Sequence, residues 1–278
     1  INSFNPLRMK EQGVHKETDT AVTDNRTMRT LLSDTGSIIH AGGSYTDSDG
    51  EPRTYTNSLE AMENAYAWGN RFCEMDFSLT SDGKLVCAHN AQNTWAIGLP
   101  FTSAPDHDTF MHAKVYGSLT TMDIESVAAF LREHPDVYIV TDVKAEEITN
   151  RRACEMIREA APDLVDRFII QIYHDEEYAP IRVLGFDHVI YTLYASDEDE
   201  AQENAIIKRC EEFDLSAVTV PVEWITESRI TDDVLDAIAA TGVPLFVHTV
   251  NDPGEMQMLK AHGVQGFYTD IPSSSEGR

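Results

Sequence analysis

The sequence lacks long apolar runs and is poor in basic residues. Hydrophobic residues make up 42% of its 278 residues, enough for a large core. No stretch of about 18 apolar residues occurs, which excludes a membrane-spanning helix. Only 21 Lys and Arg stand against 47 Asp and Glu, a formal charge of −26. Nucleic acids and anionic bilayers need a basic surface, so this charge argues strongly against both as partners.

Cysteine is also scarce. The four cysteines lie far apart, without a CxxC pair: Cys73, Cys87, Cys154 and Cys210. This spacing excludes a zinc finger and, at this chain length, a disulfide scaffold. We expect four buried free thiols, and a Cys73–Cys87 bridge is the alternative.

Short β-rich runs alternate with helical patterns from Ser37 onward. The helical stretch 231–242 has an N-cap residue, Thr231, and a stop residue, Gly242. Eight such runs predict a (β/α)8 TIM barrel. A doubly wound sheet is the competing fold, but no glycine-rich phosphate fingerprint follows the first run. The runs cover residues 37–43, 71–80, 137–144, 168–174, 188–194, 217–223, 244–250 and 266–272.

The pattern divides the chain into two parts. Residues 1–36 are polar, with helical patterns around 4–12 and 23–32, and are predicted to be an N-terminal helical extension that packs on the barrel. Residues 37–278 are predicted to form a single catalytic barrel. Because only SSSEGR follows the eighth strand, we expect the N-terminal helices to cover the side that lacks a closing helix.

Two long connections interrupt this pattern. One is the first βα loop, residues 44–56. The other is an insertion over residues 91–120, after a β-like piece (83–90) that follows the second strand. Loops of this length are usually lids or binding loops. In TIM barrels the active-site groups come from strand C-termini and the loops that follow them.

Acidic residues on two predicted strands suggest a metal site. Glu74 and Asp76 are two residues apart, so they share one face of the second strand. Paired carboxylates there repel each other unless a cation neutralises them, and Ca²⁺ or Mg²⁺ prefers such oxygen ligands. Asp142 and Lys144 repeat the spacing on the third strand. Solvated strand ends are the simpler interpretation of an isolated pair.

Two histidines favour the catalytic interpretation. His40 ends the first strand, before three small residues that leave its mouth open, and His89 ends the β-like piece after the second strand. A lone histidine is more often structural. Here both fall at the C-terminal ends of consecutive barrel elements, beside the acidic residues, which is the pattern of a catalytic centre.

Five segments occur in the order found in one known family. They are IIHAGG (38–43), NSLEAMENAYAWGNRFCEMDFSLTSDGKLVCAHN (57–90), TDVK (141–144), TVND (249–252) and GVQGFYTDIP (263–272). Through them the chain resembles the glycerophosphodiester phosphodiesterases, a family of phospholipase-C-like barrels. The resemblance spans residues 37–272, nearly the whole predicted barrel.

The resemblance implies a role for each matching position. Glu74, Asp76 and Asp142 would bind one divalent cation, Ca²⁺ or Mg²⁺. His40 and His89 would be the general acid/base pair. Lys144 would contact the phosphoryl oxygens. The implied reaction is hydrolysis of a phosphodiester to an alcohol and a phosphomonoester, with a neighbouring substrate hydroxyl as first attacker.

The chain departs from the family pattern near the phosphate. Ala41 stands where the family usually has Arg, and we hypothesise that Arg53 from the first long loop replaces it. Asp142 is one methylene shorter than the usual Glu. His248 stands where Trp is common, and we expect it to shape the substrate pocket together with Gln171.

Further departures surround the two histidines. Tyr55 and Thr56 replace the Pro-Glu pair that commonly precedes Asn57, and Asn90 replaces the usual Asp after the second histidine. Because the predicted metal ligands and both histidines remain, we interpret the chain as a divergent enzyme of this family.

Two other functions remain as alternatives. A phospholipase acting on lyso- or inositol phospholipids would show an apolar rim in the insertion, for which Trp95, Phe101 and Phe110 are the candidates. A non-catalytic barrel that binds phosphodiesters or metal would explain Ala41. The expected partner is a small-molecule phosphodiester, and the sequence leaves the oligomeric state open. An exported protein is favoured over a cytoplasmic one, since the chain does not begin with Met and its substrate class includes lipid debris.

Overall fold

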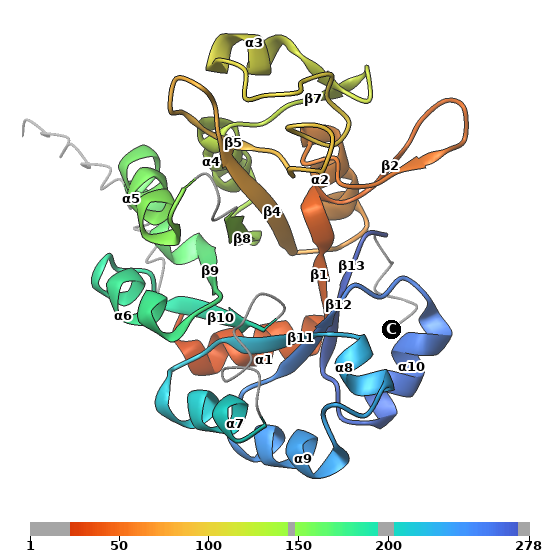
Figure 1. Ribbon diagram of the computed structural model, residues 1–278, viewed down its shortest axis with the longest axis vertical. Coiled ribbons are helices and arrows are strands. Elements are labelled where there is room, and N and C mark those ends of the chain that lie inside the picture. The colour runs from red at the N-terminus through yellow and green to blue at the C-terminus, as the bar shows by residue number, and fades with distance from the viewer. Residues whose placement is uncertain (1–22, 144–147, 194–202, 272–278) are drawn as a thin grey trace, which may run out of the picture.

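Eight parallel strands close into a barrel in the computed structural model, which describes residues 23–143, 148–193 and 203–271. Each strand pairs with its neighbours, and the first also pairs with the second, which completes the ring (Figure 1). This confirms the predicted TIM barrel. The strands are β1 (Ser37–Ile39), β4 (Phe72–Leu79), β8 (Tyr138–Val143), β9 (Phe168–Ile172), β10 (His188–Thr192), β11 (Ala217–Pro221), β12 (Leu245–His248) and β13 (Gly266–Thr269).

Helices separate most of the strands and cover the outside of the barrel. Strands covered on both faces read as continuous apolar runs, and every residue of β9 and β10 is buried. The helix predicted over 231–242 is α9 (Asp232–Ala240), with Thr231 as N-cap and Gly242 in the left-handed region. The other outer helices are α2 (Leu59–Ala67), α4 (Ile124–Glu133), α5 (Asn150–Ala160), α6 (Asp175–Val183), α7 (Glu203–Glu212), α8 (Glu223–Thr226) and α10 (Pro253–Ala261), with 3-10 turns η1 (His40–Gly42) and η2 (Pro162–Arg167).

Helix α1 (Asn25–Thr35) closes the N-terminal end of the barrel. Its Met28 and Leu32 are fully buried in a cluster with one residue from each strand. The Asn25 amide donates to the backbone oxygens of Asp187 and Asp214, just before β10 and β11. The helix thus lies under the strands, not at the side where we expected it. The helical pattern around residues 4–12 lies outside the described residues.

The insertion after the second barrel strand folds over a small core of its own. Strand β5 (Leu85–Cys87) pairs antiparallel with β4, and α3 (His107–His112), β6 (Lys114–Val115) and β7 (Leu119–Thr120) follow. Trp95 and Phe110 are buried in this core. The described insertion contributes none of the exposed large apolar side chains, so the structure gives no support for the apolar rim expected of a phospholipase.

The first long loop forms a small hairpin, β2 (Tyr45–Thr46) and β3 (Pro52–Arg53). All four cysteines are buried free thiols, as expected, and the Cys73–Cys87 bridge does not form. Among the described helices none has the length and apolar character needed to cross a bilayer.

Candidate active site

Three carboxylates converge where the second and third barrel strands end. Glu74 and Asp76 lie on β4, and the parallel register places Asp142 of β8 directly opposite Asp76. All three residues are buried, and each offers an oxygen within 4.8 Å of the others. The structure therefore brings together the residues predicted to bind a metal ion.

The electrostatics of this cluster fit a hard cation. Burial, followed by the charges of Asp76 and Asp142, raises the pKa of Glu74 above its ordinary value. Glu74 Oε2 accepts a 2.6 Å hydrogen bond from the Ala41 amide, whereas the buried Oε1 has no hydrogen-bond partner among the described residues. A buried oxygen without a donor, beside two further carboxylates, is a donor set suited to Ca²⁺ or Mg²⁺.

Asn57 fixes one of these carboxylates. Its side-chain amide donates to Asp76 Oδ2 at 2.9 Å, and its Oδ1 accepts from the Asp76 backbone N–H at 3.0 Å. Gly42 allows this contact, since a Cβ there would lie 2.6 Å from the Asn57 Cα and the backbone has a φ of +71°. The turn after β1 and the start of α2 therefore pack directly against each other.

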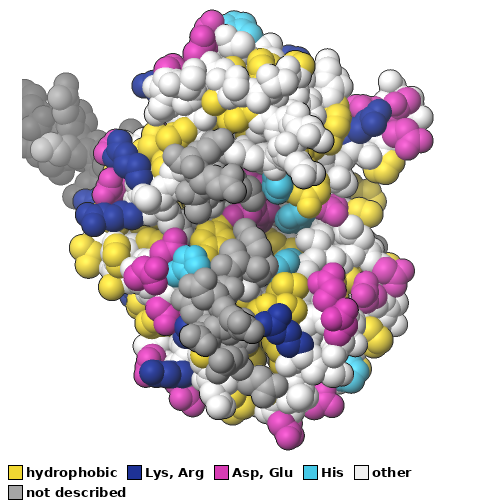
Figure 2. Space-filling model, viewed as in Figure 1, with side chains coloured by type: hydrophobic (Ala, Val, Ile, Leu, Met, Phe, Trp, Pro, Cys, Tyr) yellow, Lys and Arg dark blue, Asp and Glu magenta, His cyan; other side chains and the backbone are white. Residues whose placement is uncertain are grey.

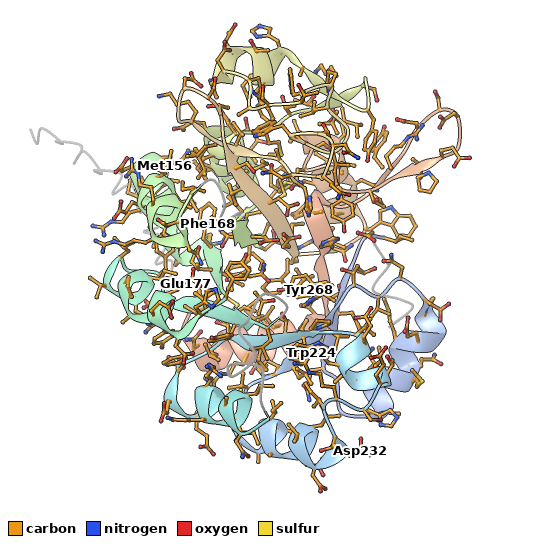
Figure 3. All side chains as sticks on the ribbon, viewed as in Figure 1. Met156, Phe168, Glu177, Trp224, Asp232 and Tyr268 are labelled. Atoms are coloured by element: carbon orange, nitrogen blue, oxygen red, sulfur yellow. The ribbon has the colours of Figure 1, made fainter. Side chains whose placement is uncertain are left out.

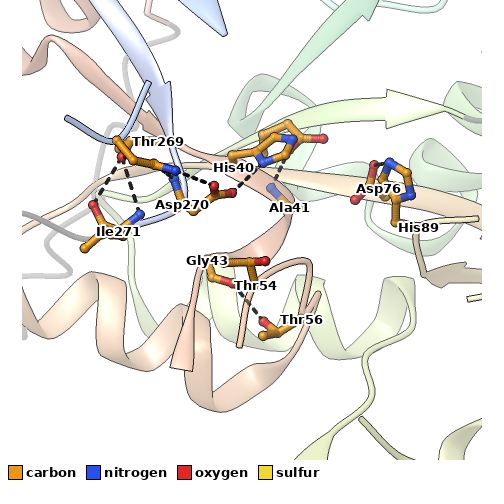
Figure 4. Close-up of polar contacts among 12 residues, drawn as sticks. His40, Ala41, Gly43, Thr54, Thr56, Asp76, His89, Thr269, Asp270 and Ile271 are labelled. Atoms are coloured by element: carbon orange, nitrogen blue, oxygen red, sulfur yellow. Dashed lines mark hydrogen bonds and ion pairs between the residues drawn. The ribbon is translucent and has the colours of Figure 1, made fainter. Parts of the chain in front are cut away.

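The two predicted catalytic histidines flank the acidic cluster. His40 Nε2 lies 4.0 Å from Glu74 Oε2, and His89 Nε2 lies 4.0 Å from Asp76 Oδ1 (Figure 4). On the face shown in Figure 2, histidine and acidic side chains gather near the centre of the molecule. Both imidazoles thus direct Nε2 toward the carboxylates.

Hydrogen bonds at Nδ1 determine the orientation of each imidazole. His89 Nδ1 lies 2.6 Å from the backbone oxygen of Asn90, which only accepts, so Nδ1 carries the proton. His40 Nδ1 lies 2.7 Å from Asp270 Oδ1. Burial lowers the pKa of His40, but the bond to Asp270 and the Glu74 charge outweigh it and raise the pKa to about 9. In the neutral form each Nε2 can accept a proton.

Sequence reasoning did not predict the contacts that three residues make at this site. Asp270, just after β13, lies within a segment that matches the family, but no role was assigned to it. Tyr55 entered only as a departure, yet its ring contacts the imidazoles of both His40 and His89, at centroid distances of 4.9 and 4.8 Å. Tyr173 donates a hydrogen bond to Asp142 and accepts one from the Val143 amide.

Arg53 lies in the β2–β3 hairpin. Its guanidinium pairs with Asp47 at 3.3 Å and with Asp49 at 3.0 Å. It also lies over the ring of Tyr116. Substrate contact by Arg53 stays a prediction and would require the guanidinium to leave these carboxylates. Lys144 lies outside the described residues.

Gln171 and His248 face the barrel interior. Gln171 Oε1 accepts a 2.6 Å hydrogen bond from the Tyr268 hydroxyl, and Tyr268 lies within the ring of strands (Figure 3). The His248 ring lies edge to face with the same tyrosine ring, at a centroid distance of 5.9 Å. Burial and the charge of His40 lower the pKa of His248 to about 4, so His248 is neutral at pH 7. Their contacts with substrate stay predictions.

Residues 41–274 match the model of the glycerophosphoryl diester phosphodiesterase family. The chain belongs to this family. It is therefore placed among the glycerophosphodiester phosphodiesterases, which are phosphoric diester hydrolases, as its sequence predicted.

Known relatives are distant in sequence but similar in fold. YqiK, an uncharacterized protein of Bacillus subtilis (strain 168), is 22% identical over 233 residues, 79% of this chain and 90% of its own. An Oleispira antarctica phosphodiesterase, solved with the product sn-glycerol-3-phosphate, is 14% identical with a TM-score of 0.64, covering 85% of this chain and 93% of its own. A Thermotoga maritima glycerophosphodiester phosphodiesterase is 19% identical with a TM-score of 0.59, covering 84% and 94%. These structures share the barrel fold.

Proposed function

We propose that this chain is a metal-dependent phosphodiesterase that hydrolyses a glycerophosphodiester-type substrate by two-histidine general acid/base catalysis. One observation carries the proposal: two imidazoles direct Nε2 at the same buried cluster of three carboxylates, each 4.0 Å from a carboxylate oxygen. A phosphodiester at this point would have a proton acceptor and a proton donor within reach.

Glu74, Asp76 and Asp142 would hold one divalent cation, Ca²⁺ or Mg²⁺. When bound, it would neutralise charge on the phosphodiester and so lower the barrier to nucleophilic attack. The Ala41 amide and the Asn57 side chain hold two of the carboxylates in place before any ion arrives. These neutral donors therefore largely preorganise the site without neutralising the carboxylates, whose negative charge remains available to bind a cation.

The histidines would move the protons. The Nε2 of one histidine takes the proton from the substrate hydroxyl that neighbours the phosphodiester, as the hydroxyl oxygen attacks the phosphorus. The other imidazole, protonated, gives its proton to the departing alkoxide as the phosphorus–oxygen bond breaks, which leaves a cyclic phosphodiester and a free alcohol. Water then opens the ring with the roles of the histidines reversed, and a phosphomonoester leaves while both histidines regain their starting states. A substrate without a neighbouring hydroxyl would not react by this route.

Four further residues would contact the substrate. Lys144 and Arg53 would place positive charge beside the phosphoryl oxygens. They would replace the arginine that the family usually has at the position of Ala41. Gln171 and His248 would line the inner wall of the pocket. His248, neutral because it is buried, would offer a hydrogen bond rather than charge.

A colorimetric phosphodiester assay tests this proposal. We expect hydrolysis by the wild-type protein, its loss on addition of a chelator, and recovery with Ca²⁺ or Mg²⁺. His40→Ala and His89→Ala should each lose nearly all activity, whereas His112→Ala, an exposed histidine of α3, should retain it. Full activity in both catalytic variants would refute the histidine mechanism, and activity insensitive to chelation would refute metal dependence.

A further inference from the structure

The aromatic ring of Tyr55 lies between the two catalytic imidazoles. Its centroid is 4.9 Å from that of His40 and 4.8 Å from that of His89, with interplanar angles of 81° and 80°. Aromatic rings prefer this edge-to-face arrangement. One side chain thus contacts both members of the proton-transfer pair.

The loop that carries this ring is firmly held. Tyr55 has a φ of +52°, a left-handed conformation that is uncommon for a non-glycine residue and often marks functional sites. The residues on either side are tied down: Thr56 donates a side-chain hydrogen bond to the Gly43 carbonyl, and the Thr54 carbonyl accepts one from the Tyr116 hydroxyl. The backbone therefore presents the ring at a defined place.

Each imidazole is held by a hydrogen bond at Nδ1. A single bond at that atom does not by itself fix the direction of the opposite ring atom, Nε2. His40 is held there by Asp270, and His89 by the backbone oxygen of Asn90. Their Nε2 atoms stand 4.0 Å from the nearest carboxylate oxygens, beyond hydrogen-bond distance. A ring in contact with both imidazoles limits how far they can tilt.

We propose that Tyr55 is a positioning residue that sets the distance between the His40 and His89 imidazoles and so aligns them for proton transfer. The inference rests on the proposed function. A planar ring is the feature that matters, since the contacts to both imidazoles are made by the aromatic ring. Phenylalanine should therefore replace Tyr55, and smaller or non-planar side chains should not.

Steady-state kinetics of the whole protein, with the cation supplied, tests this role. Tyr55→Ala should lose on the order of tenfold to a hundredfold in kcat, the cost of a misplaced catalytic group. Its KM should stay within about threefold, because ground-state binding is retained. Tyr55→Phe should keep the wild-type kcat. Tyr45→Ala, in the same loop, is the matched control and should keep it too, since Tyr45 packs against the core of the insertion.

NMR provides a second measurement that does not depend on turnover. The C–H resonances of the His40 and His89 rings should move in Tyr55→Ala, which removes the ring current, and stay in place in Tyr45→Ala. Should Tyr55→Ala fail to fold, Tyr55→Leu replaces it, filling the space without a planar ring, and must be slower than Tyr55→Phe.

The outcomes separate the two proposals. An active wild type whose folded Tyr55→Ala variant keeps the wild-type kcat, or unchanged imidazole resonances in that variant, overturns the role of Tyr55 alone. A metal-supplied wild type without phosphodiesterase activity overturns the proposed function and the role of Tyr55 together. Lower kcat in the Ala variant, rescue by Phe and shifted resonances support the role.

Discussion

His40 Nδ1 lies 2.7 Å from the carboxylate of Asp270, 230 residues later in the chain. The contact follows from barrel closure, because Ile39 of β1 pairs with Thr269 of β13. His40 and Asp270, the next residue after each of these, therefore lie side by side. Asn251 holds the second carboxylate oxygen through a 2.8 Å hydrogen bond. A residue at the end of the last barrel strand thus orients the imidazole that follows the first strand.

Asp270→Asn should lower kcat on the order of a hundredfold while leaving KM nearly unchanged. An amide can still accept from Nδ1 but carries no charge to stabilise the imidazolium during proton transfer. Asp232→Asn is the matched control, since Asp232 pairs with the exposed His262 and should tolerate the change. Equal kcat values for the wild type and Asp270→Asn would show that this pairing is only structural.

Tyr173→Phe should weaken binding of the divalent cation on the order of tenfold, as expected for loss of a hydrogen bond that orients a metal ligand. The Tyr173 hydroxyl links Asp142 to the Val143 backbone and so fixes a carboxylate that is shorter than the family's usual Glu. Isothermal titration of metal-free protein with Ca²⁺ or Mg²⁺ measures the change. Tyr178→Phe, which loses a bond to the Asp214 amide far from the site, should bind like the wild type. An unaltered affinity in Tyr173→Phe would count against the orienting role.

Arg53→Ala should raise KM on the order of tenfold, the loss expected for one charged hydrogen bond to phosphate. The present partners of Arg53 do not prevent this role, because exposed ion pairs such as that with Asp49 are worth only about 0.2–1 kcal/mol and can be exchanged. Arg132→Ala removes a comparable surface pair with Asp163 and should leave the kinetics alone. If kcat and KM are both unchanged in Arg53→Ala, another residue replaces the missing arginine.

His188 should make the free energy of unfolding fall as the pH is lowered. Burial lowers its pKa in the folded protein. The unfolded chain takes up a proton near pH 6.5, about the ordinary histidine pKa, and the folded state does so only at lower pH. Stability is therefore complete above about pH 6.5 and declines from there down to the depressed folded pKa.

Urea unfolding between about pH 7.5 and about pH 5.5 measures this effect. His188→Gln, which can still donate to Asn25 Oδ1, should show a flatter dependence than the wild type. His248, whose pKa is lowered to about 4, contributes with the same sign in both proteins and cancels in the comparison. Parallel curves would mean that His188 does not carry the effect.

The sequence was sufficient for the barrel and for the acidic cluster. All eight strands lie within their predicted runs. Strands buried on both faces are short continuous apolar runs, and runs of this length are too short for the helices between them. The spacing of Glu74 and Asp76 showed that they share a face. That Asp142 meets them follows from the parallel register of β4 and β8, which the order of the strands implies.

Contacts made by barrel closure and by loops were harder to predict. Asp270 meets His40 only because the last strand pairs with the first. Tyr55 reaches the imidazoles through left-handed backbone that side-chain periodicity does not reveal. Helix α1 closes the barrel end through Asn25, whose buried side-chain amide donates to the backbone oxygens of Asp187 and Asp214. A polar residue in an amphipathic helical pattern is expected to face solvent, so the sequence does not predict this contact.

A high-resolution crystal structure of the protein grown with Ca²⁺ or Mg²⁺ tests the central claim most directly. We predict one cation bonded to Glu74, Asp76 and Asp142, with bonds of about 2.3–2.6 Å for calcium or about 2.0–2.1 Å in an octahedron for magnesium. A catalytically active crystal form in which the cation lies elsewhere, and these three side chains bind none, would contradict the account.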